Sequence, residues 1–277
     1  MALGAALLAV HLPPAGHGLR RGRLLARDHR QRDGGAEHQG GPHHADVEST
    51  AERARSFSGS DEAVVASLRE ATVVLDDRAV LRRITLDLVP GITVLRGANG
   101  AGKTTLLRAF AGLVPLARGA RDVPQDVLYL GHRPQLLHGL TGRENLRFLK
   151  ELRGLTARAV MRVSLDGNGA SADPISYALG RWGLAADADR PVERLSAGQR
   201  RRASLARLDT ETCELALLDE PFAELDADAA ALLRRSLTDE TAPIAILIAS
   251  HGHAELDDLA VRVYEVGEGR VSLVRTR

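Results

Sequence analysis

Short apolar runs recur through most of the chain and predict a sheet that is buried on both faces. Residues 127–130, 215–218 and 244–249 are apolar at every position, a pattern typical of strands in a parallel sheet that is covered on each side. Residues 92–96 form a similar run of β-branched and apolar residues. Strands and helices are expected to alternate along this part of the chain, which indicates an α/β fold.

The segments that flank these runs differ in pattern. Residues 64–68 and 71–75 are expected to be two strands with a turn between them, and residues 84–89 alternate like a half-buried strand that Pro90 and Gly91 end. Residues from about 140 to 195 are richer in helix formers and include a loop at 166–170. They predict a helical insertion.

Residues 1 to about 60 have a different composition. They hold six of the ten histidines, and no aromatic residue precedes Phe57. A disordered tail is expected, because few of these positions could build a core. The histidines are irregularly spaced, so no metal or haem site is predicted there. The segment also fits a translation start that was set too far upstream.

Composition narrows the classes of function. The 277 residues carry a net charge of +1, so no nucleic-acid partner is expected. Cys213 is the only cysteine, which excludes a disulfide within the chain and a cysteine-based zinc site. No apolar run approaches the roughly 18 residues that a membrane span requires.

A glycine-rich loop is the most specific motif. Residues 97–104 fit G-x-x-x-x-G-K-[ST], between the strand predicted at 92–96 and a helix predicted at 106–110. In this context, backbone N–H groups bind phosphates, Lys103 can reach the β- and γ-phosphates, and the Thr104 hydroxyl can ligate Mg²⁺. The predicted nucleotide-binding residues of this loop are Gly97, Ala98, Asn99, Gly100, Ala101, Gly102, Lys103, Thr104 and Thr105.

Two further strands end in polar residues that suit the same chemistry. The strand at 215–218 runs into Asp219 and Glu220, which lie where nucleotides bind in such sheets. Asp219 can hold Mg²⁺, and Glu220 can polarise an attacking water molecule. His251 follows the strand at 244–249. It can donate to a γ-phosphate, although a structural role is equally compatible with its position.

Residues 195–199 read Leu-Ser-Ala-Gly-Gln and open a helix. Ser196 and Gly198 could form a second anion-binding site there, or Ser196 could be an ordinary N-cap. Arg200–Arg202 follow. These arginines could contact a phosphate backbone, but a solvated helix face is the favoured interpretation.

Taken together, these motifs resemble the ATP-binding cassette (ABC) ATPases over residues 64 to 275. The resemblance implies a P-loop NTPase fold of ABC type within residues 61–277, with a mixed or parallel sheet core, an antiparallel β subdomain and an inserted helical subdomain. Residues 97–105 look like Walker A and residues 215–220 like Walker B with its catalytic glutamate. Ser196, Gly198 and Gln199 fall in the signature, Asp226 in the D-loop, and His251 at the switch position.

The resemblance also implies partners. Two nucleotide-binding domains would close head to tail around two ATP molecules with Mg²⁺, each ATP between one chain's Walker A and the other's signature. A separately encoded transmembrane permease would hold the chain on the cytoplasmic face of the cell membrane as a peripheral subunit. The docking surface is expected at about residues 132–182, with Phe148, Leu149 and Leu152 as its apolar candidates.

Residues 129–135, with 140–146 and the signature, are similar to the haem-exporter ATPases of bacterial cytochrome c maturation. The Q-loop glutamine position falls on His132, while Gln135 comes three residues later, so either residue is a candidate. Leu75 replaces the aromatic residue that stacks on adenine in the family. The alternatives left open are a soluble ABC-type clamp, a regulatory ATP-binding module and a transporter of another cargo.

Overall fold

The structure is a computed structural model that describes residues 63–153, 173–239, 241–251, 256 and 258–277. The predicted tail and the predicted loop at 166–170 lie outside these residues. In the part of the chain that is described, no helix combines the length and apolar character needed to cross a membrane.

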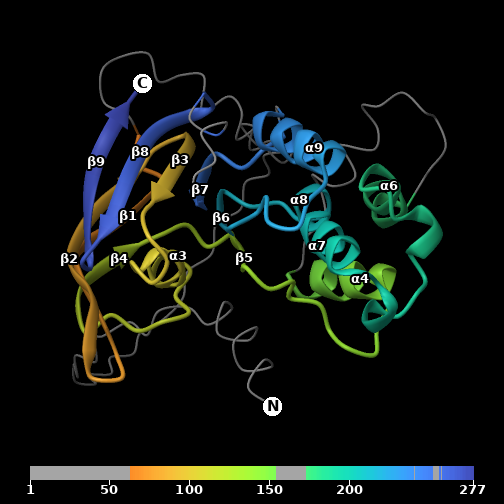
Figure 1. Ribbon diagram of the computed structural model, residues 1–277, viewed down its shortest axis with the longest axis horizontal. Helices are drawn as coiled ribbons and strands as arrows, with labels where there is room; N and C mark the ends of the chain where they lie inside the picture. Colours follow the sequence, from red (N-terminus) through yellow and green to blue (C-terminus); the bar gives the residue numbers. More distant parts are fainter. Residues whose placement is uncertain (1–62, 154–172, 240, 252–255, 257) are drawn as a thin grey trace, which may run out of the picture. The chain divides into compact units, whose positions relative to one another are not determined.

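A six-stranded sheet forms the centre of the domain (Figure 1). Its first five strands pair in parallel, and the last pairs antiparallel to its neighbour. In pairing order the strands are β5 (Val127–Leu130), β6 (Leu215–Asp219), β7 (Ala245–Ala249), β3 (Gly91–Arg96), β8 (Ala260–Gly267) and β9 (Arg270–Thr276).

The central strands are buried on both faces, as their apolar runs predict. Along β5, Leu128 and Leu130 pack with the helices on one face, whereas Val127 and Tyr129 pack with the core on the other. The mixed sheet and its flanking helices confirm the predicted α/β fold.

An antiparallel sheet of three strands, in the order β2-β1-β4, forms the predicted β subdomain. Its strands are β1 (Ala66–Leu75), β2 (Arg78–Leu88) and β4 (Arg118–Asp122). The prediction of two strands joined by a turn within 64–75 is wrong, because β1 is continuous. Leu68 pairs with Leu86 and Ala71 with Ile84. Between these pairs β1 contains one residue more than β2. Glu70, with φ of 49°, accommodates this extra residue as a β-bulge.

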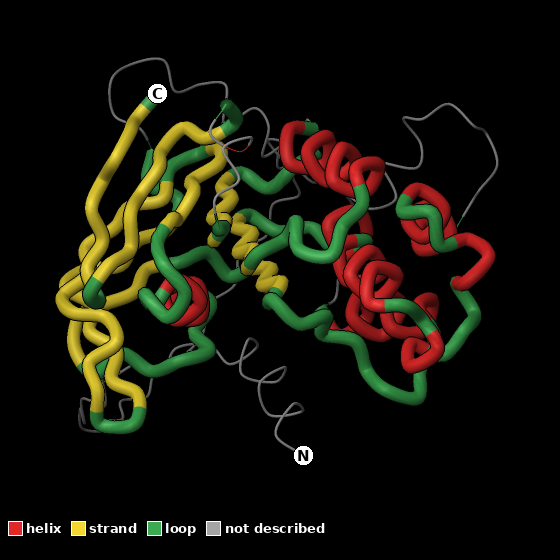
Figure 2. Tube along the Cα trace, in the orientation of Figure 1, coloured by secondary structure: helices red, strands yellow, loops and turns green. Residues whose placement is uncertain are grey.

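Helix α3 (Lys103–Phe110) lies between the two sheets (Figures 1 and 2). It buries Leu106, Leu107, Ala109 and Phe110 in the core that both sheets share. This packing fixes the helix that directly follows the glycine-rich loop. Its N-terminus therefore has a defined position relative to the end of β3.

The other face of the central sheet is covered by helices, and the described part of the insertion is helical as predicted. Buried polar contacts join the insertion to the core, where Arg181 Nη1 and Trp182 Nε1 each donate to Asp209 at 2.6 Å. These elements are α4 (Gly142–Leu152), α6 (Pro174–Arg181), η2 (Ala185–Asp187), η3 (Val192–Arg194), α7 (Ala197–Leu205), α8 (Arg207–Thr210) and α9 (Ala227–Thr238).

Candidate nucleotide site

Three loops meet at the carboxyl edge of the central sheet. The strand register places the ends of these strands at the same level, because Leu95 of β3 and Asp219 of β6 both pair with Ala249 of β7. The glycine-rich loop, Glu220 and His251 all leave the sheet within two residues of these positions. The structure therefore brings together residues that are more than 100 positions apart in the sequence, and the spacing of Lys103 and His251 is 148 residues.

The glycine-rich loop needs glycine for steric reasons at its two ends. Gly97 has φ of 134°, and a Cβ atom there would lie 2.2 Å from the carbonyl oxygen of Val266. Gly102 has φ of 108° and precedes α3 without a side-chain cap. The first N–H groups of α3 thus remain available for an anion. Ala98, Asn99 and Gly100 form the exposed rim of the loop, and Ala101 and Thr105 are partly exposed.

Lys103 is buried and is held by its own loop. Its Nζ atom donates to the carbonyl oxygens of Gly97 at 2.7 Å and Ala98 at 3.0 Å, and it lies 3.4 Å from Nδ1 of His251. An ammonium group has three donors, so the third is directed toward His251. Burial lowers the pKa of Lys103, and the carboxylates of Glu220 and Asp219 oppose that shift.

Thr104 and Asp219 form a pair that fits a magnesium ion. The Thr104 hydroxyl donates to Asp219 Oδ1 at 3.2 Å. Asp219 is 2% exposed, and within the described ranges no donor reaches its buried Oδ2 atom. A carboxylate and a hydroxyl are hard oxygen ligands, and Mg²⁺ typically uses such a pair together with water and substrate phosphates.

These two residues would not hold a metal alone. No cluster of three or more His, Cys, Asp or Glu side chains suited to a metal occurs among the residues whose structure is described. Phosphate oxygens and water are the further ligands that Mg²⁺ typically uses. The donor set therefore suits a metal that arrives with a nucleotide.

Glu220 and His251 contact each other through backbone and side chain. The N–H of His251 donates to Glu220 Oε2 at 3.1 Å, and His251 Nε2 lies 3.2 Å from Glu220 Oε1. The N–H of Glu220 donates to the Ala249 carbonyl at 2.9 Å. Glu220 has φ of 50°, an unfavourable conformation for a residue with a side chain. These contacts hold its carboxylate beside the His251 side chain.

The signature residues lie apart from this cluster. Ser196 and Gln199 form a capping box on α7, in which Ser196 Oγ accepts from the Gln199 N–H at 3.1 Å. Gln199 also donates to Asp187 at 2.6 Å. Ser196 is exposed, and no hydrogen bond or ion pair between described residues joins this segment to the loop at 97–105. The N-cap interpretation of Ser196 is therefore confirmed, and its hydroxyl hydrogen remains available.

The D-loop lies against the start of α7. A Cβ atom on Gly198 would lie 3.2 Å from the Glu224 carbonyl oxygen, so the two segments approach closely. The Asp226 side chain caps α9 by accepting from the Ala229 N–H at 2.8 Å. This contact leaves its carboxylate engaged within its own helix.

Of the two Q-loop candidates, His132 is exposed and Gln135 is partly buried. A Cβ atom on Gly131 would lie 3.5 Å from Gln135 Nε2, so the Gln135 side chain folds back over the start of the segment. The His132 backbone is held through its carbonyl oxygen, which accepts from Arg201 at 3.3 Å. Which side chain serves as the Q-loop residue remains a prediction.

Arg201 is the residue of this site that sequence reasoning missed. The expectation of a solvated face for residues 200–202 is wrong at this position, because Arg201 is 1% exposed. Helical spacing carries the only signal for its burial, since Arg201 lies four residues before the buried Leu205.

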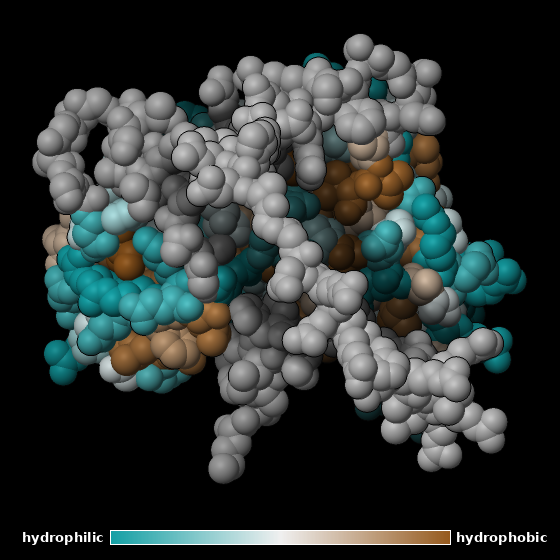
Figure 3. All heavy atoms as spheres, turned by 180° about the vertical axis from the view of Figure 1, so that it is seen from behind, coloured by the Kyte–Doolittle hydropathy of each residue, from teal (hydrophilic) through white to brown (hydrophobic). Residues whose placement is uncertain are grey.

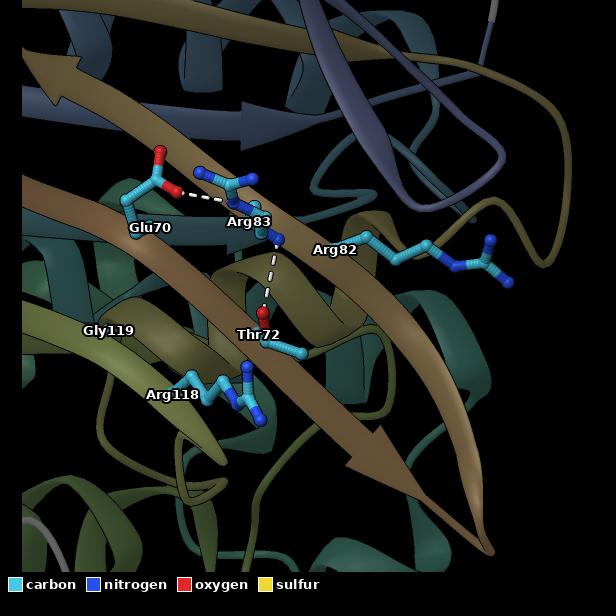
Figure 4. Close-up of a pocket in the computed structure, with 6 residues that line it drawn as sticks. All are labelled: Glu70, Thr72, Arg82, Arg83, Arg118 and Gly119. Atoms are coloured by element: carbon cyan, nitrogen blue, oxygen red, sulfur yellow. Dashed lines mark hydrogen bonds and ion pairs between the residues drawn. The ribbon is translucent and has the colours of Figure 1, made fainter.

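A hollow on the antiparallel sheet is separate from this site. A cavity of about 490 Å³ is lined by residues of β1, β2 and β4. In Figure 4, Arg83 binds Glu70 through its side chain, at 2.5 Å, and Thr72 through its backbone N–H, at 3.2 Å. None of the predicted nucleotide-binding residues lines it.

Comparison with known proteins places the chain among characterised relatives. Residues 81–223 match the ABC transporter family. The chain is 37% identical over 180 residues to the cytochrome c biogenesis ATP-binding export protein CcmA 1 of Salmonella paratyphi A, which covers 60% of this chain and 79% of that protein. It is 42% identical over 160 residues to CcmA of Bordetella bronchiseptica, with 53% and 65% covered.

Solved structures agree on the fold. An ATP-binding subunit of an ABC transporter matches with a TM-score of 0.66 at 22% identity, over 76% of this chain and 90% of that chain. MJ1267, an ATP-binding cassette of an ABC transporter, matches with a TM-score of 0.61 at 18% identity, over 77% and 92%.

The Q-loop assignment can be tested with two variants. We expect His132→Gln to retain ATP hydrolysis, because glutamine is the residue that the family usually has at this position. If His132 is the Q-loop residue, Gln135→Ala should also retain hydrolysis. The measurement is the steady-state ATPase rate of each variant beside that of the parent. A loss of activity confined to Gln135→Ala would assign the Q-loop role to Gln135.

Proposed function

Because the chain belongs to the ABC transporter family, as an ATP-hydrolysing subunit that powers a transporter, we propose that Glu220 is its catalytic base and that it serves export in cytochrome c biogenesis. One observation carries the catalytic assignment, namely the contact series from Lys103 through His251 to Glu220 at the end of β6. It joins a phosphate-binding cation, a proton donor and a carboxylate base in one place.

Lys103 binds the terminal phosphates in this proposal. Two of its donors remain on the loop carbonyls, so the third turns from His251 to a γ-phosphate oxygen. Because that donor is directed at His251 in this structure, a γ-phosphate oxygen bound by Lys103 would lie close to His251. His251 can then donate to the same phosphate.

Mg²⁺ would be held by Thr104 and Asp219 and would supply charge neutralisation at the phosphates. Asp219 keeps Oδ2 for direct or water-mediated ligation. Its burial makes this ligation favourable, because a buried carboxylate oxygen without a donor is costly.

Glu220 would accept a proton from the attacking water. Its backbone is fixed by the Ala249 carbonyl and its carboxylate by the His251 N–H. The base is thus oriented before the substrate binds, which reduces the cost of reaching the reactive geometry.

Head-to-tail dimerisation would complete the site. Ser196 is exposed and caps α7, and α7 lies apart from α3, the helix at the end of the glycine-rich loop (Figure 1). A second copy can bring its own Ser196 and Gly198 to the phosphate of this chain. Ser196 already accepts from the Gln199 N–H, so an anion at the N-terminus of α7 would be bound by other N–H groups of its first turn and by the Ser196 hydroxyl.

A permease would dock on α4 and hold the chain at the membrane. Phe148 is 42% exposed and Leu152 is 36% exposed on this helix. Leu149, the third candidate, is 3% exposed and packs inside the domain, so it is not available to a partner. Seen from behind, hydrophobic and hydrophilic residues alternate where the described surface is in view (Figure 3).

The cargo assignment rests on the relatives. Their names place them in export during cytochrome c biogenesis, and haem is the cargo that this resemblance implies. The residues of the nucleotide site do not select a cargo, so cargo choice would belong to the permease.

The base is tested by Glu220→Gln. The variant should bind ATP like the parent and hydrolyse it at least about 10²-fold more slowly, because an amide cannot accept the proton. Glu214→Gln is the matched control, since Glu214 is exposed at the opposite end of β6. Steady-state hydrolysis and equilibrium ATP binding measure the two effects. Parent-like turnover in Glu220→Gln would show that another group is the base.

The docking surface is tested by Phe148→Ser. In cells that contain the permease, the variant should move from the membrane fraction to the soluble fraction and keep its ATPase activity. Val274→Ser, at a position 59% exposed on β9, should remain on the membrane. Unchanged fractionation of Phe148→Ser would place the docking surface elsewhere.

A further inference from the structure

Arg201 of α7 is a buried cation that binds the backbone of two separate loops. Its Nη1 atom donates to the carbonyl oxygens of Gly131 at 2.8 Å and His132 at 3.3 Å. Its Nη2 atom donates to those of Asp219 at 3.1 Å and Glu220 at 2.6 Å. One guanidinium group therefore joins the Q-loop segment to the acidic pair at the end of β6.

This arrangement is costly and needs compensation. Arg201 is 1% exposed, and burial lowers its pKa, while the carboxylates of Glu224 and Asp219 oppose that shift. Four charge-assisted hydrogen bonds to carbonyl oxygens offset the loss of water. Such bonds restrain the loop backbones, because a planar guanidinium holds its partners in fixed directions.

The neighbouring arginines show that this contact is specific to one position. Arg200 donates to the Leu195 carbonyl and Arg202 to the Trp182 carbonyl at 3.3 Å. Neither of these carbonyls belongs to the Q-loop segment or to the acidic pair. The three arginines thus share a helix and a charge but differ in the loops that they bind.

Helix α7 connects Arg201 to the signature. Ser196 caps the helix five residues before Arg201, about 7–8 Å along the helix axis. A short helix moves as a rigid unit, so a displacement of its N-terminus reaches Arg201 and the four carbonyl oxygens.

We propose that Arg201 is a positioning residue that couples the ATP bound in trans by Ser196 to Glu220 and the Q-loop of the same chain. The proposal rests on the head-to-tail dimer of the proposed function. ATP at the opposite site draws in the N-terminus of α7, and Arg201 transmits this movement to the Asp219 and Glu220 carbonyls. Occupation of one site thereby sets the orientation of the base in the other.

The test compares Arg201→Met with Arg201→Lys. Methionine keeps the apolar stem but none of the hydrogen bonds, so kcat should fall between about 10-fold and 10²-fold through misplacement of Glu220. The Kd of the isolated chain for ATP should stay within about twofold, because Lys103 and Thr104 are untouched. The Hill coefficient for ATP should fall toward one. Arg201→Lys keeps the positive charge but lacks the planar guanidinium that binds two loops at once, so its kcat should lie between those of Arg201→Met and the parent.

Arg200→Met and Arg202→Met are the matched controls and should keep the parent kcat and Hill coefficient. Melting temperature identifies any variant that fails to fold. If Arg201→Met does not fold, Arg201→Lys decides the question. Parent-like kcat and Hill coefficient in the folded Arg201 variants would overturn the coupling. A failure of the proposed function is distinguishable, because the parent would then lack ATP hydrolysis or Glu220→Gln would retain it.

Discussion

The parallel register of β3, β6 and β7 is the constraint on which the site depends. Pairing of Leu95 and Asp219 with Ala249 ends the three strands at one level. The chain leaves the sheet at this level, and the loops after β3, β6 and β7 carry Lys103, Glu220 and His251 respectively. A shift of one residue in any strand would turn its side chains to the other face and move its exit loop away from the others. The apolar burial of both faces of the sheet therefore also fixes the geometry of the proposed catalytic groups.

Two buried groups of opposite charge, Lys103 and Asp219, interact at this edge of the sheet. Lys103 and Asp219 are 7% and 2% exposed. The Lys103 ammonium donates to carbonyl oxygens of its own loop, whereas no donor among the described residues reaches Asp219 Oδ2. Such groups are expensive to keep in a protein interior. Their presence at the end of a strand, beside helix N–H groups, is typical of a binding site, where a ligand of opposite charge offsets the free-energy cost of burying them.

Much of the site could be predicted from sequence because its motifs are local. The loop at 97–105 carries its own strand, glycines and helix, and Asp219 and Glu220 directly follow an apolar strand. Residues that act through tertiary contacts were not accessible in this way. Arg201 looks like its two neighbours in the sequence, and only the packing of α7 against two loops distinguishes it. At Glu70 the sequence predicts a turn where the structure has a β-bulge, because a bulge is defined by pairing with a neighbouring strand and the sequence of one strand does not show that pairing.

The most direct measurement of the central claim is the number of Mn²⁺ ions bound per chain, counted by electron paramagnetic resonance with and without a non-hydrolysable ATP analogue. Mn²⁺ replaces Mg²⁺ at oxygen sites and is visible to this method. The structure predicts about one Mn²⁺ per chain in the presence of the analogue and almost none in its absence, because Thr104 and Asp219 supply too few ligands alone. Equal binding without the nucleotide, or undiminished binding in Asp219→Ala with it, would contradict the assignment of this site.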